Sequence, residues 1–137
     1  MRAFVDTNVF VYFFDAGEPA KQRRAREVVT DLARRKSLVL SAQVLGELYV
    51  TLTRKLVDPL EPQVALRAVG DLAVYPVVPL DAPLVQRAAD TSVAEQLSFW
   101  DALILEAAAE AGASTLLTED LQAGRTYRGV TVVDPFA

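Results

Sequence analysis

Short apolar segments alternate with amphipathic segments along the chain, and this alternation restricts the fold more than any other feature. Four apolar segments have the length of buried strands: 3–5, 37–41, 115–118 and 131–133. Between them, apolar residues recur at three- and four-residue spacing, as in amphipathic helices. Such alternation predicts a parallel sheet joined by right-handed crossovers. We therefore expect an α/β fold, with a central parallel sheet of about four to five strands flanked by helices on both faces.

The predicted helices cover residues 19–36, 42–56, 63–73, 82–96 and 101–111. The segment 75–79 resembles a strand but contains two prolines, which are tolerated mainly at sheet edges. Another helix is expected to begin near Val9. The 137 residues fit one domain (1–137), without a repeat or linker.

Cysteine and histidine are both absent from the sequence. Their absence excludes disulfides, thiolate zinc sites, cysteine nucleophiles and imidazole bases. Any hydrolytic chemistry must therefore use carboxylates.

The N-terminal residues do not have the pattern of a signal peptide. The apolar run from Val9 to Phe14 is much shorter than the roughly 20 residues that cross a bilayer. We therefore expect a cytoplasmic protein that does not enter a membrane.

Charge is distributed unevenly along the chain. The net charge is −4, yet residues 21–55 contain nine Lys/Arg and three Asp/Glu. This basic segment could meet an anionic partner, and Arg23 and Arg24 are candidates for contacts with the phosphates of that partner. The alternative is an ordinary solvated helix face.

Four acidic residues are predicted to meet at one edge of the sheet. Asp6 follows the first strand and Asp120 follows the strand at 115–118, so both belong to the carboxyl edge, where ligands bind in such folds. Glu47 lies in the second turn of the helix after the strand 37–41, and Asp101 opens the helix that leads to the strand at 115–118. Clustered carboxylates without histidine or cysteine favour a hard divalent cation, Mg²⁺ or Mn²⁺. The hypothesis is a phosphodiester hydrolase that uses metal-activated water.

Each of these residues also has a structural interpretation. Asp6 or Asn8 could cap the following helix. Asp101 could bond back to Ser98 in a capping box, because the sequence from 98 to 101 reads S-x-x-D. Glu47 could be a solvated rim residue, and residues 118–120 could form a turn at the strand end.

Four short motifs, in this order and at these separations, resemble a PIN domain, and more narrowly the VapC-type toxin ribonucleases. They are Phe4-Val5-Asp6-Thr7-Asn8, the segment 41–47 that ends in Glu47, Ser98-Phe-Trp-Asp101-Ala-Leu-Ile104, and Leu116-Leu-Thr118-Glu-Asp120. The resemblance covers essentially the whole chain. It implies a PIN-like domain in which Asp6, Glu47, Asp101 and Asp120 form the catalytic, metal-binding set of a Mg²⁺/Mn²⁺-dependent endoribonuclease.

The same resemblance implies supporting roles for Asn8 and Thr118, a homodimer, an RNA substrate and a small antitoxin protein that covers the acidic site. The role of Glu119, next to Asp120, stays open at this point. The alternative function is a non-catalytic nucleic-acid- or protein-binding PIN module. An aspartyl-phosphate enzyme fits poorly, because Asn8 stands where its second aspartate would be.

Overall fold

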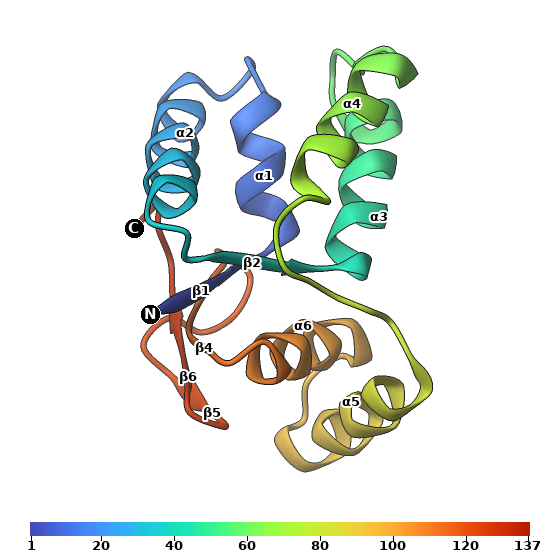
Figure 1. The fold of residues 1–137 in the computed structure, drawn as a ribbon, viewed down its shortest axis with the longest axis vertical. Helices are drawn as coiled ribbons and strands as arrows, with labels where there is room; N and C mark the ends of the chain where they lie inside the picture. Colours follow the sequence, from blue (N-terminus) through green and yellow to red (C-terminus); the bar gives the residue numbers. More distant parts are fainter.

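The central sheet runs through the middle of the molecule in the computed structural model, which describes residues 1–137 (Figure 1). Its strands, in spatial order, are β3 (Val77–Val78), β2 (Leu38–Ser41), β1 (Arg2–Val5), β4 (Ala113–Leu117), β6 (Val130–Val133) and β5 (Thr126–Tyr127). All neighbouring pairs are parallel except β5 and β6. The expected α/β class is confirmed, and the carboxyl ends of five strands share one edge.

The sheet has six strands, slightly more than the four to five expected. The proline-flanked segment forms β3 at one edge, where proline costs no ladder hydrogen bond. The strand missed by the sequence analysis is β5, a two-residue strand that pairs antiparallel with β6. The turn between them places Arg128 and Gly129 at φ values of 49° and 79°, as in the tight hairpin turns that match strand twist.

Helices cover both faces of the sheet. On one side lie α1 (Thr7–Phe14), α2 (Pro19–Arg34), α3 (Ala42–Val50) and α4 (Pro62–Leu72), and on the other α5 (Ala82–Glu95) and α6 (Phe99–Glu110) (Figure 1). None of these helices combines the length and the apolar character needed to span a membrane.

Several helix boundaries differ from the expectation by one or more residues, and two of the differences have a clear local cause. The predicted helix 42–56 is α-helical only to Val50 and continues as a π-helical turn, η1 (Thr51–Lys55). Within it, the Thr53 hydroxyl bonds back to the carbonyl oxygens of Tyr49 and Val50, a contact that bends helices. The last long helix begins at Phe99 rather than 101, because the Ser98 side chain caps it.

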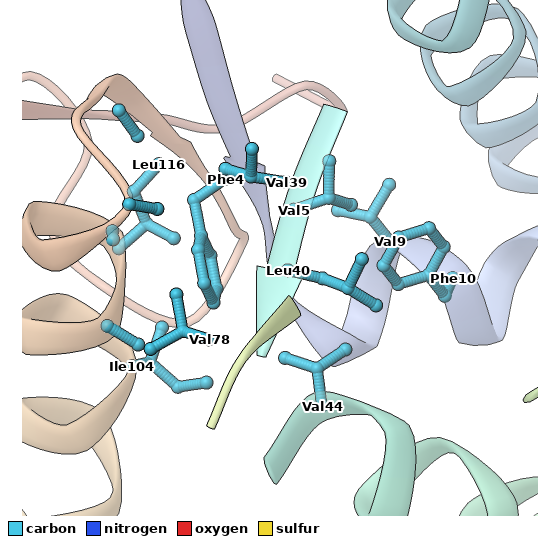
Figure 2. Packing of buried hydrophobic residues seen from close by; sticks show 14 of the residues in the cluster. Phe4, Val5, Val9, Phe10, Val39, Leu40, Val44, Val78, Ile104 and Leu116 are labelled. Carbon is cyan, nitrogen blue, oxygen red and sulfur yellow. The ribbon is translucent and has the colours of Figure 1, made fainter. Parts of the chain in front are cut away.

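The core on the two faces of the sheet fixes the orientation of β1. Phe4 points toward α6 with Ile104 and Leu116, whereas Val5 lies on the opposite face with Val9 and Phe10 (Figure 2). These side chains are at most 4% exposed. Because alternate residues of a strand face opposite sides, burial on both faces holds β1 firmly at the centre of the sheet. The next residue, Asp6, is thereby held at the carboxyl edge.

Candidate active site

Asp6 lies where β1 ends and α1 begins, and its side chain is held on both oxygens. Oδ1 accepts a hydrogen bond from the backbone N–H of Thr7 at 2.7 Å, and Oδ2 accepts one from the Thr118 hydroxyl at 2.8 Å. The residue is 8% exposed and is the N-cap of α1, so the capping interpretation is confirmed. Capping leaves the carboxylate at the sheet edge among other acids.

Burial raises the pKa of Asp6 from 3.8 to about 6. The hydrogen bonds from Thr118 and Thr7 oppose this rise, and the neighbouring carboxylates of Asp120 and Glu47 add to it. The carboxylate of Asp6 therefore lies in surroundings that disfavour its negative charge, and a nearby cation would relieve that penalty.

Thr118 is the centre of the hydrogen bonds at the end of β4. Its fully buried hydroxyl donates to Asp6 and accepts from Asn8 Nδ2 and from the Asp120 backbone N–H, both at 3.1 Å. Asn8 Nδ2 also donates to Asp120 Oδ2 at 3.0 Å. The turn expected for residues 118–120 is thus present, and it joins two acids from opposite ends of the chain through two polar side chains.

Glu47 stands at the rim on α3 and is exposed. Its Oε1 is 3.5 Å from the hydroxyl of Thr7, the residue that follows Asp6. Desolvation in the cleft raises the pKa of Glu47, and the Asp101 carboxylate raises it further. Glu47 is therefore adjacent to the Asp6 cluster without being bonded to Asp6 itself.

Asp101 lies in the first turn of α6 and is partly buried. Its backbone N–H donates to the Ser98 hydroxyl at 3.1 Å, and the reverse bond of a capping box, from the Ser98 amide, is absent. The side chain of Gln43, on α3, donates to the Trp100 carbonyl at 3.5 Å and so links α3 to the start of α6. The Asp101 carboxylate has no hydrogen bond or ion pair of its own.

A cleft of about 380 Å³ opens beside Glu47 and Asp120, whereas Asp6 and Asp101 do not line it. Its charged lining residues are all acidic: Asp15, Glu18, Glu47 and Asp120. The sequence did not indicate Asp15 and Glu18 as site residues. They flank the turn between α1 and α2, and nothing in their spacing predicts that they lie near Glu47. An anionic substrate could approach such a cleft only if cations offset the negative charge of the cleft.

The chemistry of these side chains fits a hard cation, because every donor is an oxygen. In addition, the buried Asn8 Oδ1 lacks a hydrogen-bond partner. However, no three acidic side chains of the structure are arranged so that they could hold a metal ion together. Asp6, Asn8, Thr118 and Asp120 form a bonded cluster. Glu47 approaches this cluster at Thr7, and Asp101 is near Glu47.

Glu119, whose role the sequence left open, faces α1 and α2. Its Oε1 accepts a hydrogen bond from the Tyr12 hydroxyl at 2.6 Å, and its Oε2 is 3.0 Å from Lys21 Nζ. The bonds to Glu119 and Tyr12 raise the pKa of Lys21. Burial and the bond to Glu119 raise the pKa of Tyr12.

The two arginines predicted as possible contacts to RNA phosphates lie on α2, outside the cleft lining. Arg24 Nε donates to the Pro135 carbonyl at 2.8 Å, and its guanidinium is 3.6 Å from Glu27. Arg23 is exposed beside Arg26 and Arg34. Their role toward RNA stays a prediction.

The fold and the site define an α/β domain with acidic residues gathered at the carboxyl edge of a parallel sheet. Residues 3–129 match the model of the PIN domain family. The chain therefore belongs to the PIN domain family, as the sequence motifs predicted. No curated protein matches the sequence significantly.

Solved structures with the same fold include three from toxin–antitoxin systems. A toxin–antitoxin complex from Klebsiella pneumoniae aligns with a TM-score of 0.71 and 20% identity, over 97% of each chain. VapC20 from Mycobacterium tuberculosis, a sarcin-ricin loop cleaving toxin, aligns with a TM-score of 0.64 and 23% identity, over 83% of this chain and 86% of that one. VapBC2 from Rickettsia felis, bound to a promoter DNA fragment, aligns with a TM-score of 0.66 and 18% identity, over 96% and 97%. At these identities the likeness establishes a shared fold.

Proposed function

We propose that this protein is a metal-dependent endoribonuclease and the toxin of a toxin–antitoxin pair. The observation that carries the proposal is the buried Asp6 carboxylate, joined through Thr118 and Asn8 to Asp120 at the carboxyl edge of a PIN-domain sheet. The shared fold with VapC20 and with toxin–antitoxin complexes supports the choice of RNA as substrate and of an antitoxin as partner.

In this proposal Asp6, Glu47, Asp101 and Asp120 hold Mg²⁺ or Mn²⁺, whose chemistry is to activate water and to stabilise the leaving oxygen. Asp6 is held by two hydrogen bonds and serves as the fixed ligand. Glu47 is exposed, so its side chain can change rotamer without displacing packed neighbours. Such a rotation would help to complete a ligand group that is not preformed.

The surrounding residues would orient the carboxylates. Thr118 and the Thr7 amide fix the Asp6 oxygens, which favours the ionised form that a cation needs. Asn8 holds Asp120 toward Asp6, and its partnerless Oδ1 is available to a bound water or to an ion. The homodimer stays a prediction from the family resemblance, and the cytoplasmic location stays a prediction from the N-terminal sequence.

The test is incubation of purified protein with total cellular RNA in Mn²⁺ or Mg²⁺, beside EDTA and beside the Asp6→Asn variant. The proposal predicts discrete products that require both the metal and Asp6. Equal products from wild type and variant would contradict it. Tight RNA binding with no cleavage of any RNA, including candidate hairpins from ribosomal RNA, would favour the non-catalytic PIN module.

A further inference from the structure

The segment from Thr118 to Asp120 is held at three successive residues. Thr118 bonds to Asp6, and Asp120 accepts from Asn8. Between them, Glu119 bonds to Tyr12 on α1 and to Lys21 on α2. Glu119 therefore joins this segment to α1 through one carboxylate oxygen and to α2 through the other.

Aromatic packing fixes the donor side of this contact. Lys21 Nζ lies 4.7 Å from the centroid of the Tyr12 ring and donates to the Tyr12 hydroxyl at 3.2 Å. The Tyr12 ring packs edge-on against Phe136, with centroids 5.0 Å apart. Lys21, Tyr12 and Glu119 therefore form a closed set of mutual contacts, here called the brace.

The brace lies next to the hydrogen bond between Asn8 and Asp120, which is exposed to solvent. Asp120 is exposed, and its carboxylate has one hydrogen bond from a side chain, that of Asn8. After Asp120, Leu121 packs against the core, and backbone hydrogen bonds join Gly124 and Arg125 to Val132 of β6, so the loop is anchored to the sheet and not to α1 or α2. The brace is thus a second attachment of this segment to the helices, beside the bonds from Asn8, and it alone reaches α2.

We propose that Glu119 is a positioning residue, which uses Lys21 and Tyr12 to hold the Asp120 carboxylate in place for cation binding. This inference rests on the proposed function, because Asp120 is a ligand only if the site binds metal. It also assigns Lys21 to the protein's own Glu119 rather than to an RNA phosphate.

Lys21→Met separates this role from simple electrostatics. Removing a positive charge near acidic ligands should, by Coulomb attraction alone, tighten Mn²⁺ binding. The brace predicts the opposite, about tenfold weaker Mn²⁺ binding, as is usual when a residue that orients a metal ligand is lost. Glu119→Gln should weaken binding in the same direction.

The experiment measures the Mn²⁺ dissociation constant from the electron paramagnetic resonance signal of the free ion, together with backbone ¹⁵N order parameters of Asp120. The order parameter should be near 0.85 in the wild type and below about 0.6 in both variants. Glu110→Gln is the matched control, because its 3.1 Å bridge to Arg87 is also a surface pair and lies on α6 and α5. It should reproduce both wild-type values.

Wild-type or tighter Mn²⁺ binding by Lys21→Met would overturn the inference, whether or not the segment loosens. A raised KM for RNA at an unchanged Mn²⁺ dissociation constant would also overturn it and would place Lys21 at the substrate. If the wild type binds no Mn²⁺, the proposed function fails separately. The order parameters then decide whether Glu119 holds Asp120: lost order in the variants supports the holding role, and retained order contradicts it.

Discussion

Replacing Asp6 by asparagine should change how the stability of the fold depends on pH. The pKa of Asp6 is raised from 3.8 to about 6, with burial as the largest cause. The folded state therefore binds this proton more tightly than the unfolded state does. The resulting stability is fully present below pH 3.8 and is lost as the pH rises through about 6. The shift corresponds to about 3 kcal/mol.

Asp6→Asn removes this titration. Asparagine keeps an oxygen for the Thr7 N–H but loses the acceptor of the Thr118 hydroxyl, a cost of about 1–2 kcal/mol that does not depend on pH. The free energy of unfolding of the variant, relative to wild type, should therefore increase by up to about 3 kcal/mol between pH 3.5 and pH 7.

Urea unfolding across this pH range, in EDTA, measures the difference. Asp58→Asn is the control, because Asp58 is exposed in the loop before α4 and is hydrated in both states. That variant should follow the wild-type curve. Parallel curves for wild type and Asp6→Asn would contradict this prediction, since they would mean that Asp6 titrates alike in the folded and unfolded chains.

Three further predictions concern the site and its surroundings. Thr118→Val should lower the free energy of unfolding by about 1–3 kcal/mol, because Asp6, Asn8 and the Asp120 amide lose the hydroxyl that they share. Thr118→Ser keeps a hydroxyl and should retain most of the wild-type stability. Urea unfolding checks both variants. Mn²⁺ at one hundred times its dissociation constant should stabilise the wild type by about 2.7 kcal/mol at neutral pH but Asp6→Asn much less, and equal shifts in melting temperature would contradict binding at this site. Charge reversal of Arg23 and Arg24 should make the plot of log RNA affinity against log salt concentration less steep by about two. An unchanged slope would mean that this part of α2 is a solvated face.

The order of the elements could be predicted because β1, β2 and β4 are short apolar runs between amphipathic helices. The hairpin strand β5 could not, because two residues show no alternation and Arg128-Gly129 is a weaker turn signal than Asn-Gly. The end of α3 also depends on a local contact, the hydrogen bond from the Thr53 hydroxyl to the Tyr49 carbonyl, which the spacing of apolar residues cannot predict.

The site was predictable at the level of topology. Asp6 and Asp120 follow neighbouring parallel strands, so the order of strands alone brings them to one edge. The bonds between them were not predictable in detail, because they join residues about a hundred positions apart. Thr118 as a shared partner and Glu119 as a bridge to Lys21 both depend on how α1 and α2 dock on the sheet.

The ends of the RNA products formed by purified protein in Mn²⁺ distinguish metal-activated water from other routes of cleavage. Water that attacks phosphorus and expels the 3′ oxygen leaves a 5′-phosphate and a 3′-hydroxyl. Wild type should give these ends, and no products should form in EDTA or with Asp6→Asn. Products that carry 2′,3′-cyclic phosphates, or that persist in EDTA, would contradict a carboxylate-held metal as the source of cleavage.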